Sequence, residues 1–205
     1  MRPLSALCLS LIAVCASCVT AAYEPPTPEA RIENYTRTID KPFDETWEAM
    51  ISYASSTFFE IRNFEKESGL LTLAFGSSDP GQFVDGGHWK FKSQSLNPGQ
   101  SIDFEGNYVD FLAIYRNGKL DGRMNVFLKP TSENRTEVVV KARYVVTSRV
   151  VDPNVGLVED TWAFNSGGSD TVAVRNPTRG TEAARTLRPT YKAENSLLAA
   201  VEEMR

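Results

Sequence analysis

The chain has few of the residues that build disulfides and metal centres. Its cysteines, Cys8, Cys15 and Cys18, all lie near the start, and His88 is the one histidine among 205 residues. The chain beyond Cys18 therefore cannot form a disulfide, and one histidine without cysteines cannot supply the ligands of a zinc site. We expect no metal, no cofactor, and a structural or surface role for His88.

The sequence also lacks a catalytic motif: no Gly-x-Ser-x-Gly turn is present, so a serine hydrolase would have to recruit the isolated His88. The glycines within 81–87 and 167–168 lack the Lys-Ser/Thr pair and the helix start of a phosphate-binding loop. Three acidic residues lie near one predicted sheet edge: Asp103, Glu105 and Asp110. Such carboxylates could serve a glycosidase, but charged residues are usual on the wet face of an antiparallel sheet. We predict that the protein is not an enzyme and has no catalytic residue.

A basic excess is absent too. The formal net charge is −4 and the isoelectric point is near 5.2, whereas a general nucleic-acid-binding protein needs a basic face. We therefore expect no nucleic-acid partner. Hydrophobic residues at 41% and charged residues at 23% are ordinary values for a globular protein, so a folded domain is expected.

No apolar stretch near the start is long enough to cross a bilayer as a helix. Leu4–Val14 has only the roughly 7–15 residues of the apolar region of a signal peptide. Val14–Cys18 places small residues before a cysteine and resembles the lipobox of bacterial lipoproteins, in which that cysteine receives a diacylglyceryl group. The resemblance implies a signal peptide at 1–17 and a Cys18 that carries lipid and incorporates palmitate. Cleavage after Ala21, which would remove every cysteine, is the alternative.

The lipoprotein resemblance also implies a location. Val19, rather than an aspartate, follows the cysteine. In enterobacterial lipoproteins this favours the inner leaflet of the outer membrane, facing the periplasm. A soluble periplasmic protein is the alternative. Residues 18–30 include three prolines and are expected to form an extended tether, followed by a single domain at 31–205.

Amphipathic helices are predicted near both ends of this domain. Pro42-Phe43-Asp44 introduces the first, with Asp44 as N-cap and apolar residues at helical spacing from Trp47 to Phe58. The second follows Pro189-Thr190. Its apolar face consists of Ala193, Leu197, Leu198 and Val201, and its polar face of Lys192, Glu194, Glu202 and Glu203.

Between the helices, runs of β-branched and aromatic residues alternate with turn signals. The predicted strands are 31–39, 60–64, 70–75, 88–95, 101–105, 108–116, 119–128, 137–151, 161–165 and 171–175. Asn117-Gly118 predicts a hairpin between 108–116 and 119–128, and Gly167-Gly168-Ser169 predicts another. The expected fold class is α+β: a curved antiparallel meander packed against two amphipathic helices, in a helix-grip-like arrangement.

Within this pattern, Asp40–Phe75 is similar to the helix-grip modules of bacterial envelope lipoproteins such as BamC of the β-barrel assembly machine. The residues that carry the resemblance are Pro42-Phe43-Asp44, Trp47 and Ser68-Gly69. The resemblance implies that Trp47 faces the sheet, that Ser68-Gly69 turns a hairpin, and that another envelope protein is a partner. It covers about a fifth of the chain, and no second copy of the helix motif follows. Segments 161–167 and 188–194 resemble a pattern of small Gram-negative lipoproteins, which implies no activity.

A basic segment precedes the last helix. Its members are Arg175, Arg179, Arg185, Arg188 and Lys192, against Glu182 alone. Such a surface could bind lipid phosphates or an acidic protein, although a solvated loop is the alternative. Eight aromatic residues either line a cavity under the curved sheet or pack in the core: Trp89, Phe91, Phe104, Tyr108, Phe111, Tyr115, Phe127 and Tyr144.

These features predict a lipid-anchored, non-enzymatic module of the periplasm. It would bind another envelope protein through a sheet edge or through the basic segment, and the membrane through its lipid. The alternative is a carrier of a small apolar ligand in a cavity under the sheet. An envelope hydrolase is the third candidate, and no set of nucleophile, base and metal can be assembled for it.

Overall fold

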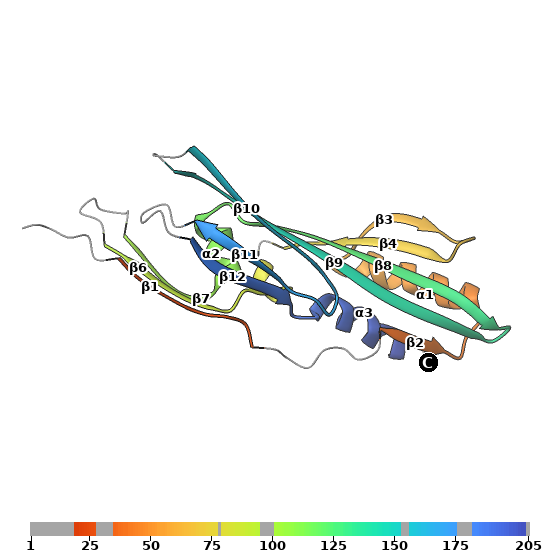
Figure 1. Cartoon of the computed structure of the whole chain (residues 1–205). Coiled ribbons are helices and arrows are strands. Elements are labelled where there is room, and N and C mark those ends of the chain that lie inside the picture. Colours follow the sequence, from red (N-terminus) through yellow and green to blue (C-terminus); the bar gives the residue numbers. More distant parts are fainter. Residues whose placement is uncertain are drawn as a thin grey trace, which may run out of the picture.

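The structure is a computed structural model that describes residues 19–27, 35–77, 79–94, 101–152, 156–175 and 182–203 (Figure 1). The expected signal peptide at 1–17, the expected lipid site Cys18 and Arg179 lie outside the described residues. Residues 31–34 of the predicted first strand lie outside them too, whereas 35–39 are described.

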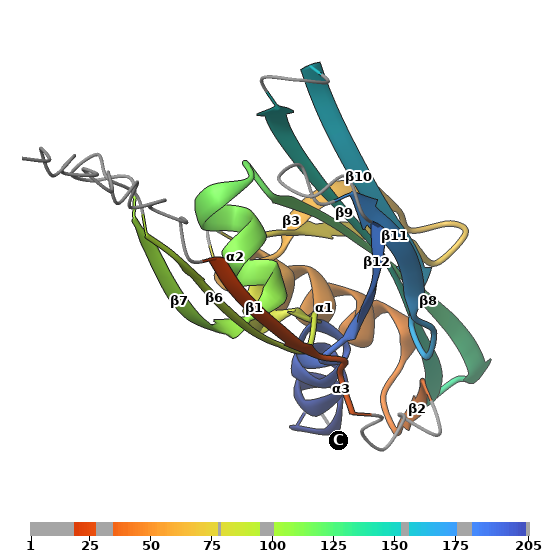
Figure 2. The ribbon, with the colours of Figure 1, turned by 60° about the vertical axis from the view of Figure 1, so that its left-hand side comes forward.

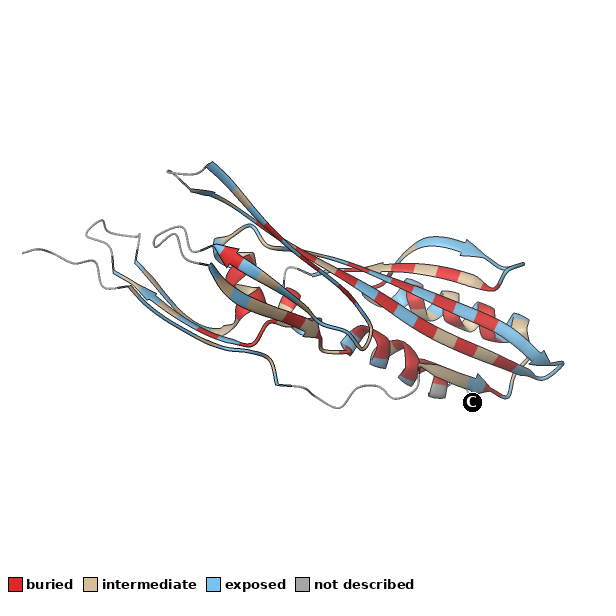
Figure 3. Cartoon of the chain, in the orientation of Figure 1, coloured by how far each residue is buried: buried red, intermediate tan, exposed pale blue. Residues whose placement is uncertain are grey.

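A six-stranded antiparallel sheet forms the centre of the fold. Its strand order is β10 (Gly156–Asn165), β9 (Arg135–Asp152), β8 (Lys119–Ser132), β4 (Leu70–Phe75) and β3 (Glu60–Glu65), and β2 (Thr36–Ile39) pairs with β9. Buried and exposed residues alternate along β8 and β9, as Figure 3 shows, because successive side chains of a strand point to opposite faces. The valine-rich run is the longest strand, and the predicted α+β class is confirmed.

Two helices, α1 (Phe43–Ser56) and α3 (Lys192–Glu203), pack on this sheet. The apolar face of α3 is buried as predicted. Two details of the prediction are wrong. Pro42, not Asp44, occupies the N-cap position of α1, and Asp44 instead pairs with Lys66 at 2.8 Å. Glu194 belongs to the core, since none of its surface is exposed.

A third helix, α2 (Tyr108–Tyr115), corrects the predicted strand 108–116. Asn107 caps it, because the Asn107 side chain accepts a hydrogen bond from the backbone nitrogen of Val109. Tyr108 contacts Trp162 of β10, and both Tyr108 and Phe111 contact Trp89 of β6 (His88–Ser93). Because α2 lies between two layers (Figure 2), it is apolar on most of its surface and shows no helical period in the sequence.

Two smaller antiparallel sheets complete the fold. One has the order β1 (Val19–Glu24), β6 (His88–Ser93) and β7 (Ile102–Asn107). The other has the order β11 (Asp170–Arg175), β12 (Glu182–Pro189) and β5 (Val84–Asp85), and a short 3-10 helix, η1 (Pro80–Gln82), precedes β5. The predicted hairpin of 161–165 with 171–175 is therefore wrong, since β11 pairs with β12.

Strand β1 lies in the segment that we expected to be a tether. It pairs with β6 over its full length, from Val19 opposite Ser93 to Glu24 opposite His88. The hydroxyl of Tyr23 donates a hydrogen bond to the carbonyl of Thr186 and accepts one from the nitrogen of the same residue, at 3.2 and 2.9 Å. These bonds tie β1 to β12, so residues 19–24, which precede the prolines, belong to the folded part of the described chain.

Candidate functional site

A pocket with a volume of about 260 Å³ lies where α2 meets the two small sheets. It is lined by aromatic residues and arginines, most of which lie near the ends of their elements: Trp89, Phe91, Tyr108, Phe111, Tyr115, Arg116, Arg175 and Arg185. We call it the aromatic–arginine pocket. Aliphatic side chains, among them Ala21 of β1 and Ala183 of β12, form the rest of its wall.

The aromatic wall is a set of mutually packed rings. Trp89 stacks on Phe91 with 5.9 Å between ring centroids, and its ring meets Tyr108 and Phe111 edge-on at 5.7 and 5.8 Å. Offset stacking and edge-to-face contacts are the favourable arrangements of aromatic pairs. Since Trp89, Tyr108 and Phe111 are all buried, their packing fixes the shape of the wall.

Arg185 lies against these rings. Its guanidinium carbon is 4.3 Å from the ring centroid of Tyr23, 4.8 Å from that of Trp89 and 5.5 Å from that of Tyr108. A cation over an aromatic face is attracted by the negative face of the ring. Nη1 of Arg185 donates a hydrogen bond to the carbonyl of Ala184, whereas Nε is buried without a hydrogen-bond partner among the described residues.

The positive charge of the pocket is not neutralised by ion pairs. Within the described part of the chain, no carboxylate lies within 4.0 Å of Arg116, Arg175 or Arg185, while neighbouring Lys90 and Lys92 on β6 both pair with carboxylates. Like Nε of Arg185, Nε1 of Trp89 and one terminal nitrogen of Arg116 are buried and have no hydrogen-bond partner among the described residues. The residues that line the pocket therefore carry three positive charges and several unpartnered donors.

Two titratable groups adjoin the arginines. Burial raises the pKa of Tyr108 to about 12, even though Arg116 and Arg185 pull it down, so Tyr108 is neutral at physiological pH. Burial also raises the pKa of Asp160 on β10, against the charge of Arg116 and a hydrogen bond with Ser148. One buried carboxyl does not balance three guanidinium groups.

The residues of the predicted basic segment lie in different places in the structure. Arg175 and Arg185 both line the pocket. Arg188 lies apart, with Nε 3.7 Å from a carboxylate oxygen of Asp85, and Lys192 bonds to Gln82 beside the ring of Phe83. Arg116 was missed by sequence reasoning, because it ends a run that was interpreted as a strand and has no basic residue directly beside it.

The eight aromatic residues named in the sequence analysis also lie in different parts of the structure. Five of them line the pocket. Phe104 packs on Phe111 and Tyr115, Tyr144 lies in the core beneath α3, and Phe127 is 41% exposed on β8. Five members of the set therefore line a cavity, although it lies at α2 and the small sheets and not simply under the curved sheet, and the other three do not line it.

The three acidic residues considered as glycosidase carboxylates each bind another group. Asp103 pairs with Lys92 and Glu105 with Lys90, while Asp110 accepts a hydrogen bond from the backbone nitrogen of Gly81. His88 is exposed, with Nε2 at 3.4 Å from Glu105. Among the residues that the structure describes, no group of three or more His, Cys, Asp or Glu side chains could hold a metal ion.

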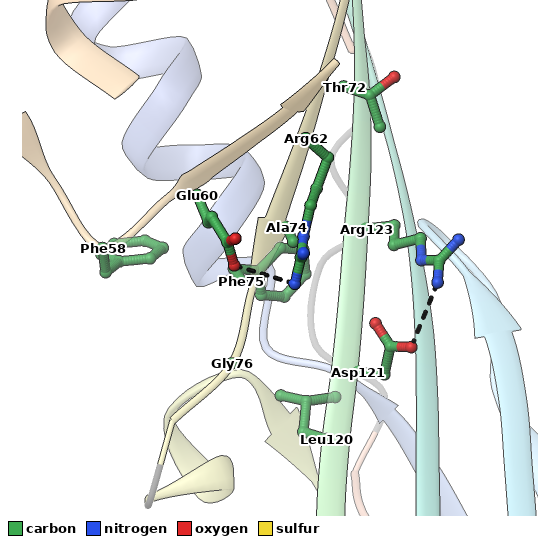
Figure 4. A pocket seen from close by; sticks show the side chains of 10 residues that line it. All are labelled: Phe58, Glu60, Arg62, Thr72, Ala74, Phe75, Gly76, Leu120, Asp121 and Arg123. Carbon is green, nitrogen blue, oxygen red and sulfur yellow. Dashed lines mark ion pairs between the residues drawn. The ribbon is translucent and has the colours of Figure 1, made fainter. Parts of the chain in front are cut away.

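A larger hollow of about 660 Å³ lies beside β3, β4 and β8 (Figure 4). Its charges neutralise each other, since Arg62 pairs with Glu60 at 2.9 Å and Arg123 with Asp121 at 3.6 Å. This hollow therefore has neither the unpaired charge nor the packed aromatic wall of the aromatic–arginine pocket, which is the better candidate site.

No protein-family model, curated protein or solved structure matches the chain. Of the described helices, none combines the length and apolar character that a membrane span requires. Function must be inferred from the residues and geometry of the chain itself.

Proposed function

We propose that the protein is a lipid-anchored, non-enzymatic binding protein of the cell envelope. In this proposal it faces the periplasm from the inner leaflet of the outer membrane and carries a small ligand with an apolar body in the aromatic–arginine pocket. The observation that carries the proposal is the pocket's wall of five aromatic residues. Concave sites with mostly apolar linings and a few convergent polar groups are the usual form of small-molecule sites.

The packing of the wall favours binding. Ring contacts among Trp89, Tyr108 and Phe111 hold the surface in place before a ligand arrives. A ligand then loses less free energy to ordering of the protein than it would in a flexible site. Preorganisation of this kind suits a carrier, which has to bind and release its ligand without a chemical step.

A matched pair of alanines on β12 tests ligand binding. Ala183 lines the pocket and Ala184 is exposed on the opposite face of the strand, so Ala183→Phe should fill the pocket and Ala184→Phe should not. We expect the wild type and Ala184→Phe to bind 1-octanol, a neutral probe, and Ala183→Phe to lose that binding in a calorimetric titration. Equal binding by both variants would place the probe elsewhere and contradict the proposal.

The position of β1 supports anchorage at Cys18. Cleavage before Cys18 leaves β1 whole, whereas cleavage after Ala21 would remove half of the strand and the wall residue Ala21 itself. The anchor is tested by labelling with radioactive palmitate. Label should enter the wild type and fail to enter Cys18→Ser, and equal labelling of the two would refute the anchor.

A second candidate function, binding of another envelope protein, is favoured by the edge of the main sheet. β3 is the last strand of the sheet, and Phe64 on it is 64% exposed. An apolar groove of about 400 Å³ runs between α1 and β3 and is lined by Trp47, Ile51, Ile61 and Phe64. Exposed edge strands can accept a strand from a partner. A partner resembling that of barrel-assembly lipoproteins stays a prediction.

The edge is tested with two phenylalanines. Phe64→Glu should abolish co-purification of a partner from detergent extracts, and Phe127→Glu, which alters an exposed phenylalanine on β8, should retain it. Retention by both variants would exclude this edge as the binding surface.

A further inference from the structure

We infer that the ligand of the aromatic–arginine pocket is an amphiphile whose anionic group, a carboxylate or a phosphate, binds Arg116, Arg175 and Arg185. The inference rests on the proposed function, because it names the chemical class of the molecule that the pocket would carry. It adds a polar head to the apolar body that the aromatic wall selects.

The first argument is the uncompensated charge. Arg116 follows α2, Arg175 ends β11 and Arg185 lies within β12, so the fold brings three guanidinium groups from separate elements to one cavity. Like charges that share a partly buried site repel each other, and this repulsion grows as water is excluded. Other exposed cations of the described chain are commonly paired, for example Arg149 with Glu159 at 2.6 Å. An anion in the pocket would supply the missing counter-charge.

The second argument comes from hydrogen bonding and does not depend on charge. Trp89 is 7% exposed, and its indole Nε1 is a buried donor with no partner among the described residues. Nε of Arg185 and Nη1 of Arg116 are also buried and have no hydrogen-bond partner among the described residues. Buried donors without acceptors are rare in folded proteins because each one loses its bond to water. Residues of the pocket wall thus carry donors that lack acceptors, and a ligand group that only accepts hydrogen bonds is the complement of such a wall.

Carboxylates and phosphates meet this demand. Both present several acceptor oxygens and no obligatory donor, and both match the planar fork of a guanidinium group. Arginine on an aromatic platform is also well suited, since Arg185 can keep its contact with Tyr23 and Trp89 while its edge donates hydrogen bonds. A neutral alcohol or a cation would leave the donors or the charges unsatisfied.

The size of the pocket limits the apolar part. Its volume of about 260 Å³ suits a short apolar chain. An eight-carbon chain is therefore a suitable probe, and a longer chain would have to extend beyond the pocket. Four probes of equal chain length isolate the head group: octanoate, octyl phosphate, 1-octanol and octyltrimethylammonium.

Calorimetric titration of the purified wild-type protein tests the inference. We expect octanoate or octyl phosphate to bind at least about tenfold more tightly than 1-octanol, and the affinity of the anion to fall as salt is added. Preference for octanoate would identify a carboxylate, and preference for octyl phosphate would identify a phosphate head group. Equal binding of the anions and 1-octanol, or preference for the ammonium probe, would overturn the inference and leave the proposed function intact. Absence of binding by all four would overturn both.

Single substitutions of arginines test which residues bind the anionic head group. Arg175→Gln changes an exposed residue and should fold normally, while Arg185→Gln removes the half-buried guanidinium group. Each should reduce the preference for the anion over 1-octanol several-fold, and Arg185→Lys should restore part of it. Arg149→Gln, outside the pocket, is the matched control and should keep the preference. If Arg175→Gln and Arg149→Gln behave alike in folded protein, the arginines of the pocket do not bind the head group.

Discussion

Tyr144 donates a hydrogen bond of 2.5 Å to the carboxylate of Glu194, which joins the longest strand of the sheet to the last helix. Ser166, just beyond β10, donates a second bond, at 2.8 Å, to the other carboxylate oxygen. Burial and the charge of Glu194 raise the pKa of Tyr144 far above its ordinary value. The core therefore contains a polar connection that fixes where α3 lies on the sheet.

Tyr144→Phe should lower the free energy of unfolding by about 1–3 kcal/mol, because it leaves a buried carboxylate with one donor fewer. Urea unfolding followed by circular dichroism measures the change. Tyr115→Phe is the control, since Tyr115 is 38% exposed, and should cost less than about 0.5 kcal/mol. Equal stabilities of the two variants would show that the bond between β9 and α3 contributes little.

Asn107→Ala should destabilise the protein by about 2 kcal/mol. The side chain caps α2, accepts a second bond from the nitrogen of Gly86 and donates one to the carbonyl of Val84. Loss of a cap alone costs ~1 kcal/mol, and the two further bonds join α2 to β5. Asn63→Ala, at an exposed position of β3, is the control for urea unfolding. A similar loss in both variants would contradict the role given to the cap.

Alanine substitutions at two glycines with positive φ distinguish the cost of backbone strain from the cost of steric overlap. Gly69 has φ +66°, and a Cβ there would overlap the carbonyl oxygen of Leu128, whereas Gly156 has φ +83° and open space around it. Gly156→Ala should cost about 1–2 kcal/mol from the left-handed conformation alone. Gly69→Ala should cost clearly more in thermal or urea unfolding. Equal costs would mean that the β3–β4 turn relaxes away from β8.

Because of Tyr108, the free energy of unfolding should depend on pH in the alkaline range. Its pKa is about 12 in the folded protein and about 10 in an unfolded chain, so the folded state holds the proton more tightly. The contribution to stability is complete below pH ~10 and is lost as pH rises toward ~12. Between about pH 9 and 11, the stability of the wild type should fall by ~1 kcal/mol relative to Tyr108→Phe. A difference that does not change with pH would contradict the shift.

The elements with one wet face could be predicted from the sequence. The period of apolar residues identified α1 and α3, and alternation with turn signals identified most strands, because half of each element faces water. Glu194 was assigned to the polar face of α3, since its partners Tyr144 and Ser166 are distant in the sequence and no local pattern reveals them.

The errors fall where an element is covered on several sides or lacks large side chains. α2 is packed between layers, and its apolar, aromatic sequence therefore resembles a strand. The asparagine before it was a usable signal, since Asn107 stands where an N-cap is expected. β1 consists mostly of small residues, and its pairing depends on Tyr23 contacting β12, which only the folded chain shows.

Some residues of the pocket could be predicted from the sequence. Composition marked Arg175 and Arg185 as part of a basic segment, and the aromatic set was recognised as a possible lining. Arg116 joins them through the path of α2, and that path could not be derived from a segment interpreted as a strand. The structure places Arg175 and Arg185 together with Arg116 on the wall of one pocket, and anion binding there stays a prediction.

The early start of β1 limits how far the pocket can lie from an anchor. Ala21, a wall residue, is three positions after Cys18, and three residues of extended chain span at most about 11 Å. A lipid on Cys18 would therefore hold the pocket at the level of the head groups. An amphiphile could then pass between bilayer and pocket without diffusing free through the periplasm.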